Sequence, residues 1–317
     1  MQGIILAAGH GSRLQPITLT RSKAMVPILG KPIVERVMEH LLCNGVDDLI
    51  LVVSPNDRHI TRYFRRESRI EADVRFAYQP ERLGMANALV GAAPLINDDF
   101  VLSACDNLIS EEYVGQMLAA WKGEPRPNGI LTLMPVEPER LGNVGIVELD
   151  GQWVRRIVEK PSPAEAPSNI SSLPLYCFSR GFLDYLPRVP LSARGEYELQ
   201  DAIQMLIDRV GNVAGVFIES RLTLTGPEDL LAINRHYLMA GQDQPQLAPF
   251  TVGPGTHLVT PLRIEQNTVI GANCVIGPRV YIEKDCRIGT GVTIKDAVVL
   301  RGAVIADNAM IIGEVIS

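Results

Sequence analysis

Residues 1–32 read MQGIILAAGHGSRLQPITLTRSKAMVPILGKP, and this stretch decides how the chain begins to fold. Gly3–Ala8 is a short apolar run without polar alternation, which predicts a buried strand of a parallel sheet. Gly9 and Gly11 follow, and glycine suits a backbone that approaches a ligand closely or takes a positive φ. Successive N–H groups in such a loop favour anions. The loop is therefore a candidate phosphate site, although the glycines alone fit a tight turn equally well.

The composition excludes several classes of protein. The chain has 317 residues, 46% of them hydrophobic and 21% charged, which is typical of a globular protein of about two domains. No apolar run approaches the roughly 20 residues of a membrane span, and no signal peptide is evident. The net charge of −6 disfavours nucleic acid as a partner. The five cysteines lack metal-binding spacing, so we expect reduced, buried thiols in a cytoplasmic protein. From the charge and the lack of a long apolar run, we expect the protein to bind neither nucleic acid nor membrane.

Apolar runs alternate with helical periodicity over the first 120 residues. This alternation predicts an α/β fold with a doubly wound, Rossmann-like mixed sheet whose ligand site lies at the C-terminal ends of the strands. From Gly129 the pattern changes to strand pairs, with a hairpin that turns at Asp150-Gly151. The expected strands are Gly3–Ala8, Asp48–Ser54, Asp73–Gln79 and Phe100–Cys105, and the expected helices are Ile33–Asn44, Met85–Ala93, Tyr197–Arg209 and Pro227–Ala240.

The C-terminal stretch repeats every six residues, a period that fits neither a helix nor a hairpin sheet but does fit a solenoid of stacked strands. The repeating aliphatic positions are Val252, Leu258, Ile264, Ile270, Ile276, Ile282, Ile288, Ile294 and Leu300. A second repeating position holds Thr256, Thr268, Cys274, Val280, Cys286, Val292 and Val298. The register slips by one at Ile305 and continues to Ile311. The pattern resembles a hexapeptide left-handed parallel β-helix, which we expect at 252–317. The expected linker is then 241–251, and 1–240 is left as the catalytic domain.

A longer motif gives the opening loop its interpretation. Residues 6–32, LAAGHGSRLQPITLTRSKAMVPILGKP, resemble the signature LAAGxGTRLxP…K…KP of the sugar-1-phosphate nucleotidyltransferases. The motif is neither a Rossmann fingerprint nor a P-loop, because the third glycine and the GK[ST] element are missing. The resemblance implies transfer of a nucleotidyl group from a nucleoside triphosphate to a hexose 1-phosphate such as glucose 1-phosphate, with release of pyrophosphate. Among the triphosphates, dTTP or UTP is favoured.

The same resemblance assigns roles to individual residues. It implies that Arg13 grips the departing pyrophosphate and that Lys23 contacts the phosphates where the substrates meet, since fixed cations stabilise the charge that develops there. The amide of Gln79 would read the base, because it can donate and accept at once. The residues that the resemblance places along the nucleotide are Leu6, Ala8, Gly9, Gly11, Ser12, Gln79 and Gly84.

A metal and a sugar site follow from the same resemblance. Asp106 in SACDNL stands where the family has a metal-binding aspartate, and a hard carboxylate there suits Mg²⁺. Glu159 would accept hydrogen bonds from sugar hydroxyls and Lys160 would pair with the sugar's phosphate. The residues implied to bind the sugar phosphate are Asn107, Gly145, Glu159, Lys160 and Asn169.

Three positions depart from the family's pattern. Met85 replaces a small or hydroxyl residue, and Pro174 replaces a glycine beside the sugar pocket. Thr223, in SRLTLTGPEDLL, replaces a second metal-binding aspartate and leaves Asp106 as the only carboxylate carried over. The alternative function is therefore a regulatory or weakly active paralogue that binds a nucleotide-sugar.

Two further features receive structural interpretations. The arginines of 58–69 form a basic helical face, which we expect to be solvated, with an oligomer contact as the alternative. The β-helix is expected to serve assembly into a homo-oligomer, because stacked strand edges and aliphatic ends need a cover. An acyltransferase site in the β-helix is disfavoured, since the stretch is short and has a single histidine, His257.

Overall fold

The computed structural model describes residues 1–241 and 249–317, and it divides into two compact units. The first unit comprises Met1–His10 and Val34–Arg221, and the second comprises Gly11–Ile33 and Leu222–Ser317. Most of the expected linker, 242–248, lies outside the described residues. Within the described ranges, no helix combines the length and the apolar character that a membrane crossing needs. In this division the segment 11–33 belongs to the same unit as the C-terminal solenoid, although the sequence places it in the catalytic domain.

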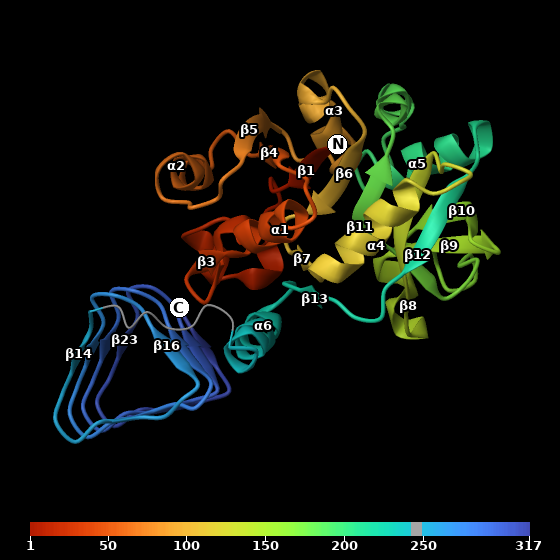
Figure 1. The fold of residues 1–317 in the computed structure, drawn as a ribbon. Coiled ribbons are helices and arrows are strands. Elements are labelled where there is room, and N and C mark those ends of the chain that lie inside the picture. The colour runs from red at the N-terminus through yellow and green to blue at the C-terminus, as the bar shows by residue number, and fades with distance from the viewer. Residues whose placement is uncertain (242–248) are drawn as a thin grey trace. The chain divides into compact units, whose positions relative to one another are not determined.

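Four parallel strands form one half of a nine-stranded sheet in the first unit (Figure 1). They are β1 (Gln2–Leu6), β4 (Asp48–Val53), β5 (Asp73–Tyr78) and β6 (Phe100–Ala104), in the spatial order β5-β4-β1-β6. The strands lie where the sequence predicts them, each ending one or two residues early. Because the chain order reverses direction between β1 and β6, the switch point of the parallel half lies between these two strands.

The other half of the sheet contains antiparallel pairings, so the predicted mixed sheet is confirmed. β11 pairs antiparallel with β6 and with β8, and β12 pairs parallel with β8. The predicted hairpin is present, with its turn at Asp150-Gly151. The strands of this half are β8 (Gly129–Pro135), β9 (Gly145–Asp150), β10 (Trp153–Glu159), β11 (Ile170–Phe178) and β12 (Val213–Phe217).

Helices cover both faces of this sheet (Figure 1). The side chains of α3 and α5 share one apolar cluster with Ile4 of β1, and the ring of Phe182 in η6 stacks on Phe178 at 3.9 Å between centroids. On the opposite face, Leu41 of α1 and Leu49 of β4 lie where a side chain at Gly3 would stand. The helices are α1 (Ile33–Leu42), α2 (Arg58–Arg66), α3 (Met85–Ala92), α4 (Glu111–Trp121), η6 (Arg180–Arg188) and α5 (Leu199–Arg209).

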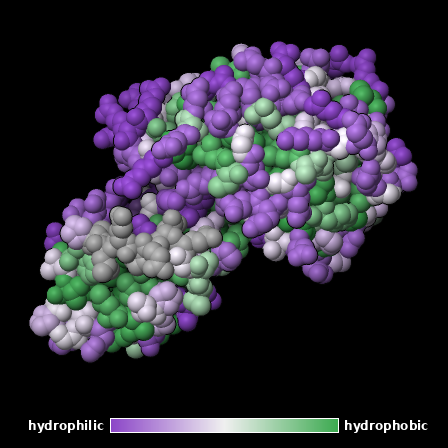
Figure 2. Space-filling view, in the orientation of Figure 1, coloured by the Kyte–Doolittle hydropathy of each residue, from purple (hydrophilic) through white to green (hydrophobic). Residues whose placement is uncertain are grey.

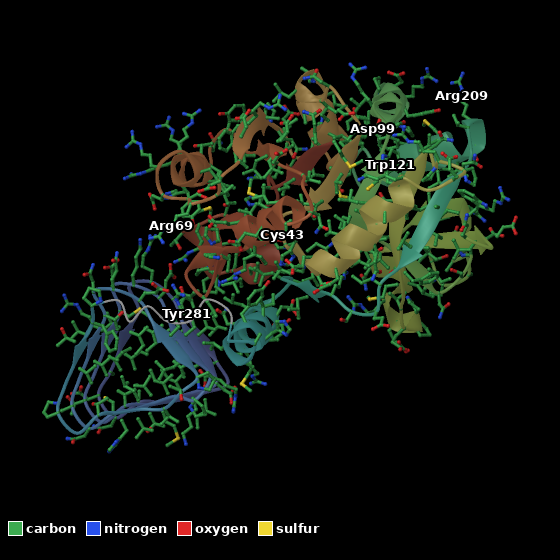
Figure 3. The ribbon with its side chains drawn as sticks, in the orientation of Figure 1. Cys43, Arg69, Asp99, Trp121, Arg209 and Tyr281 are labelled. Carbon is green, nitrogen blue, oxygen red and sulfur yellow. The ribbon has the colours of Figure 1, made fainter. Side chains whose placement is uncertain are left out.

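Two expectations about the first unit are wrong. The helix predicted from Tyr197 begins at Leu199, because the backbone of Tyr197 bonds instead to Leu83 and Ala86: its N–H donates to the Leu83 carbonyl at 2.8 Å, and its carbonyl accepts from Ala86 at 3.2 Å. Cys43 is exposed rather than buried, since it follows the end of α1 (Figure 3). All five cysteines are free, as expected, and the other four are buried.

The second unit contains a solenoid of three parallel sheets, each of four short strands, as the six-residue repeat predicts. Ile264, Ile276 and Ile294 belong to its buried aliphatic cluster. Glycine follows the aliphatic residue where coils meet closely; a Cβ at Gly271 would stand 2.5 Å from the Gly289 carbonyl oxygen. The strands are β14 (Thr251–Val252), β15 (His257–Leu258), β16 (Leu262–Ile264), β17 (Val269–Ile270), β18 (Val275–Ile276), β19 (Val280–Ile282), β20 (Arg287–Ile288), β21 (Thr293–Lys295), β22 (Ala297–Val299), β23 (Val304–Ile305), β24 (Met310–Ile312) and β25 (Val315–Ile316). Helix α6 (Pro227–Met239) precedes them.

The register of the solenoid slips earlier than predicted. Ile282 pairs with Val299 rather than with Leu300, and Tyr281 pairs with Val298. Three residues, Gly277–Arg279, separate Ile276 from Val280, whereas only two, Lys295 and Asp296, separate their partners Ile294 and Ala297 in the next coil. The slip thus falls before Ala297, so Leu300 does not belong to the aliphatic column. Val252 and Leu258 also leave the predicted core, because the first coil exposes them.

The segment 11–33 is bonded to the solenoid through buried polar groups. The Arg21 guanidinium donates to both carboxylate oxygens of Glu283 at 2.9 Å, and each of the two side chains is only 10% exposed. The N–H of Gly30 donates to the hydroxyl of the fully buried Tyr281 at 3.1 Å (Figure 3). The N–H of Leu29 donates to Asn234 Oδ1 in α6 at 3.1 Å. These bonds tie the segment that carries Arg13 and Lys23 to the C-terminal part of the chain.

Glu283→Ala should destabilise the second unit by about 3 kcal/mol, because it leaves the Arg21 guanidinium buried without its counter-charge. Chemical denaturation read by fluorescence measures the loss, and hydrogen exchange should show faster exchange of the amides of 11–33. Asp150→Ala is the control: the Asp150–Arg155 pair is 70% and 56% exposed, so its loss should cost less than about 1 kcal/mol. Equal losses in the two variants would contradict a specific role for the buried pair.

Candidate functional site

The predicted nucleotide loop leaves the sheet beside the predicted metal ligand. Leu6 pairs with Ala104, and the carbonyl of Leu6 accepts from the N–H of Cys105 at 3.1 Å. Ala8 and Asp106 therefore follow the C-terminal ends of two adjacent strands, as the sequence predicts. Arg82, which sequence reasoning missed, donates from Nε to the Ala8 carbonyl at 2.7 Å and brings a cation to this loop.

Gln79 supports the loop that precedes α3. The side chain is 6% exposed, and its amide nitrogen donates to the Gly84 carbonyl at 3.0 Å and to Asn87 Oδ1 at 2.9 Å. Gly84 has φ +94, and a Cβ there would stand 2.6 Å from the Tyr197 carbonyl oxygen. The predicted contact of Gln79 with a base stays a prediction, and in this arrangement the amide oxygen is the atom left to make it.

The other predicted nucleotide residues belong to the second unit. Ser12 and Arg13 lie exposed in η1 (Ser12–Leu14), which Gly11 precedes with φ +64. A Cβ at Gly11 would stand 3.0 Å from Lys23 Cβ, so the glycine permits the close approach of η3 (Lys23–Met25). The Gly11 carbonyl also accepts from the Thr18 hydroxyl at 2.8 Å. The structure thus brings Gly11 and Lys23 together, while a cleft shared with Asp106 stays a prediction.

The predicted sugar residues Gly145 and Glu159 are brought together by the β9–β10 hairpin, where they pair directly. Glu159 Oε1 lies 3.5 Å from Lys160 Nζ and 3.6 Å from the guanidinium of Arg194. Burial raises the pKa of Glu159, and the neighbouring Glu198 adds to the rise, while Lys160 and Arg194 oppose it. A Cβ at Gly145 would stand 3.1 Å from Glu159 Oε2, so a larger residue would crowd the carboxylate unless the side chain of Glu159 shifted slightly.

Two buried acceptors meet at this point. Glu159 Oε2 and Gln200 Oε1 have no hydrogen-bond donor among the described residues. The side chain of Gln200 flanks Gly145, with its amide nitrogen 3.4 Å from the position of a Cβ there. A buried acceptor without a donor costs free energy, and a ligand hydroxyl would remove that cost. Gln200 was missed by sequence reasoning, although it lies within the motif ARGEYELQDAI.

Asn169 and Pro174 both lie in or beside β11. Asn169 is exposed, and its carbonyl accepts from the N–H of Val136 at 2.9 Å, so its predicted contact with the sugar phosphate stays a prediction. Pro174 coincides with a break in the β8–β11 register between Leu173 and Tyr176, as expected for a residue without an N–H. The carbonyl of Pro174 accepts from the Asn107 amide at 3.5 Å.

The turn at Asp106 and Asn107 contains a second residue that sequence reasoning missed. The Asn107 side chain is 3% exposed, and its Oδ1 accepts from Arg221 Nη1 at 3.2 Å. The residues described here include no group of three Asp, Glu, His or Cys side chains able to hold a metal ion. Asp106 therefore stays the carboxylate that the sequence predicts for Mg²⁺, and no cluster of further carboxylate, histidine or cysteine ligands surrounds it among the described residues.

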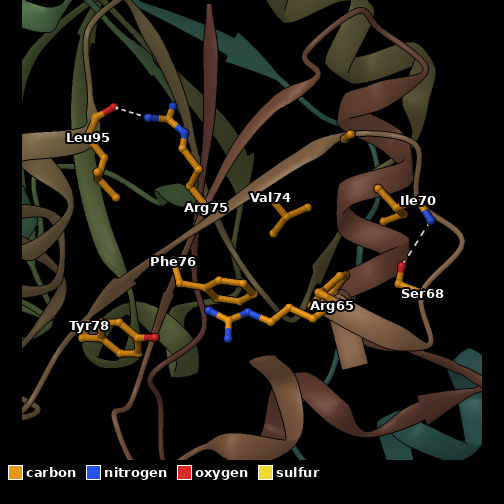
Figure 4. A pocket seen from close by; sticks show the side chains of 10 residues that line it. Arg65, Ser68, Ile70, Val74, Arg75, Phe76, Tyr78 and Leu95 are labelled. Carbon is orange, nitrogen blue, oxygen red and sulfur yellow. Dashed lines mark hydrogen bonds between the residues drawn. The ribbon is translucent and has the colours of Figure 1, made fainter. Parts of the chain in front are cut away.

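A surface pocket of the first unit is lined by none of the predicted site residues, although Tyr78, one of its lining residues, directly precedes Gln79. It has a volume of about 450 Å³ and is lined by α2, β5 and the residues between them, with Arg65, Arg75 and Phe76 among them (Figure 4). The Arg65 guanidinium lies over the Phe76 ring at 5.8 Å. The arginines of α2 are exposed, as predicted, and the surface over this helix is strongly hydrophilic (Figure 2).

Comparison with known families gives this arrangement its context. The model of the nucleotidyl transferase family matches residues 2–222, and that of the GMPPB C-terminal domain matches residues 258–317. The chain belongs to the nucleotidyl transferase family. The first match covers the sheet and the sites at its strand ends, and the second covers most of the solenoid.

Individual relatives agree with this assignment. The chain is 34% identical over 240 residues to the bifunctional protein GlmU of Methanococcus maripaludis, covering 75% of this chain and 54% of that protein. It is 30% identical over 326 residues to the glucose-1-phosphate thymidylyltransferase of Streptomyces griseus, covering 96% and 89%. The chain thus spans about half the length of its GlmU relatives. The predicted resemblance to sugar-1-phosphate nucleotidyltransferases is confirmed.

A solved relative shows the same fold. The structure of a UDP-glucose pyrophosphorylase complexed with UDP-glucose superposes with a TM-score of 0.68 and 22% identity, covering 75% of this chain and 98% of that chain. At this identity the likeness establishes the fold of the nucleotidyltransferase unit.

Gly84→Ala should destabilise the loop that precedes α3 by more than the positive φ of Gly84 alone explains. The new Cβ would meet the backbone carbonyl of Tyr197, which cannot move as a flexible side chain would. Gly45→Ala is the matched control, since Gly45 also has a positive φ, +75, but no atom within 4 Å of a Cβ. We expect about 1 kcal/mol of destabilisation for the control and a larger loss for Gly84→Ala, measured by thermal unfolding with and without UTP. Equal effects would contradict the steric argument.

Proposed function

We propose that the protein transfers a nucleotidyl group from a nucleoside triphosphate, with dTTP or UTP favoured, to a hexose 1-phosphate such as glucose 1-phosphate. The observation that carries the sugar part is the pair of buried acceptors, Glu159 Oε2 and Gln200 Oε1, which lack donors among the described residues beside Gly145. Sugar hydroxyls are donors of the kind these acceptors need. The names of the relatives support the same reaction.

In the proposed reaction an oxygen of the sugar phosphate attacks the α-phosphorus in line. A new P–O bond forms as the bond to pyrophosphate breaks, and no covalent enzyme intermediate arises. Arg13 and Lys23 neutralise the charge on the leaving and non-bridging oxygens, and Glu159 with Lys160 holds the sugar phosphate. The remaining predicted residues, Leu6, Ala8, Gly9, Gly11, Ser12, Gln79, Gly84, Asn107 and Asn169, would line the two substrates.

Several finer features belong to the proposal as well. A divalent ion, Mg²⁺, would accompany the triphosphate, with Asp106 as the carboxylate available to it. The solenoid would be a left-handed β-helix, and the boundaries at 240 and 252 would separate it from the catalytic domain. Assembly into a homo-oligomer would use the solenoid, whose exposed apolar side chains include Val304 and Met310. Sedimentation of the full chain measures that assembly.

Pyrophosphate release, measured with dTTP, UTP, GTP, CTP and ATP against several sugar 1-phosphates in Mg²⁺, tests the reaction. Turnover with at least one pairing, and preference for a pyrimidine triphosphate, is the expected result. Absence of turnover with every pairing, from protein shown to be folded by circular dichroism, would refute the function.

Glu159→Gln should remove the acidic limb of the pH profile of kcat/KM for the sugar phosphate. The ionised carboxylate accepts from hydroxyls, and burial places its pKa above the usual 4.5, so activity should fall as the pH drops through that raised value. The variant should raise KM roughly tenfold without loss of stability at neutral pH, where the buried charge is itself unfavourable. Glu165→Gln, at an exposed position of the same region, is the control and should leave the profile unchanged.

A regulatory or weakly active paralogue is the second candidate, and Thr223 favours it. If the missing aspartate limits catalysis, Thr223→Asp should raise Mg²⁺-dependent turnover roughly tenfold or more. Thr223→Ser is the control, because it keeps a neutral hydroxyl. No gain in the aspartate variant would count against this version.

A further inference from the structure

Arg221 is an unusual arginine for its surroundings. The side chain is half-buried at the end of the first unit, and its one hydrogen bond within the described residues runs from Nη1 to Asn107 Oδ1 at 3.2 Å. It forms no salt bridge with any carboxylate in the described ranges. A guanidinium has five N–H donors and stays charged at all physiological pH values, so most donors of this half-buried cation have no partner among the described residues and remain open to a ligand or solvent.

The charges around Arg221 place it within the proposed site. Burial lowers its pKa; the charge of Asp106 opposes this, that of Arg140 adds to it, and Tyr176 opposes it. Tyr176 is fully buried and is itself influenced by both Glu159 and Arg221. Arg221 therefore lies beside the Asp106–Asn107 turn, and Tyr176 is near enough to feel the charges of both Arg221 and Glu159.

The guanidinium of Arg221 has a neutral hydrogen-bond partner at this turn and no carboxylate in salt-bridge contact among the described residues. Asp106 is the one acidic residue of the turn, the neighbouring Asn107 gives its oxygen to the guanidinium, and the described residues form no metal-binding cluster. Thr223 contributes no charge in the following segment. A planar guanidinium with spare donors binds phosphate through paired hydrogen bonds, which a neutral or acidic turn cannot do.

We propose that Arg221 is a catalytic residue that binds a phosphate group of the substrates at the Asp106–Asn107 turn. It supplies there a fixed positive charge beside the negative charge of the phosphate oxygens, a role that a bound metal cation could otherwise fill. The ligand is either the pyrophosphoryl portion of the triphosphate or the phosphate of the sugar. The inference rests on the proposed function for its catalytic meaning, but the phosphate binding itself can be measured separately.

Calorimetric titration of the full chain with inorganic pyrophosphate and with glucose 1-phosphate, both in EDTA, tests the binding. Arg221→Gln should weaken the binding of one of the two ligands roughly tenfold or more. Arg221→Lys should weaken it less, because the charge remains but the planar fork of donors is lost. The ligand that weakens identifies which phosphate Arg221 holds. Arg180→Gln is the control: Arg180 Nε donates to the Ile96 carbonyl at 3.1 Å, away from the predicted site residues, and the variant should bind as the wild type does.

The proposal is overturned if the wild type binds neither ligand without metal, or if Arg221→Gln binds both with wild-type affinity. Thermal unfolding checks the fold, and if Arg221→Gln is unfolded, Arg221→Lys decides by the same criterion. In turnover assays Arg221→Lys should lower kcat if the pyrophosphoryl group is held, or raise KM for the sugar phosphate if that group is held. A wild type that turns over nothing, yet loses pyrophosphate binding on substitution, would refute the proposed reaction and leave the phosphate site standing.

Discussion

The parallel pairing of β1 with β6 is the constraint on which the candidate site depends. Both strands are buried on both faces, and their register sets Leu6 beside Ala104. The loop after Leu6 and the turn at Asp106 consequently leave the sheet at the same edge, next to each other. A slip of one residue would exchange the two faces of a strand and is prevented by the apolar clusters on either side. Side chains far apart in the sequence are thus brought to one place by backbone hydrogen bonds.

The predicted phosphate loop is divided between the two units. Its first residues, up to His10, continue from β1, whereas Gly11 and the residues after it are bonded to the solenoid and α6. Burying the Arg21–Glu283 pair in a low-dielectric interior costs free energy unless further hydrogen bonds stabilise the charges. Glu283 has such a bond, because its Oε2 also accepts from the N–H of Arg301 at 2.8 Å. The solenoid therefore holds the segment that carries the two predicted catalytic cations, in addition to any part it has in assembly.

Periodicity and turn chemistry predicted most of the fold. The parallel strands, the hairpin at Asp150-Gly151 and the coiled repeat all follow from local patterns. The errors in the position of α5 and in the register of the solenoid arise where backbone segments remote in the sequence determine the local structure. The start of α5 depends on the bonds of Tyr197 to Leu83 and Ala86, and the solenoid slip depends on a corner shortened at Asp296. Arg82, Gln200 and Arg221 were missed for the same reason, because each acquires its place from a partner remote in the sequence.

The polar groups of the first unit show an asymmetry that a single kind of ligand would match. The buried oxygens of Glu159 and Gln200 are acceptors without a donor among the described residues, whereas the guanidinium of Arg221 has one neutral partner there, Asn107. The two ends flank the buried Tyr176, whose surroundings include both Glu159 and Arg221. A sugar phosphate, the substrate class proposed above, carries hydroxyl donors for the acceptors and an anion for the guanidinium. Since a buried acceptor without a donor costs free energy, a ligand that brings hydroxyls gains at Glu159 and Gln200, whereas pyrophosphate would gain only at Arg221.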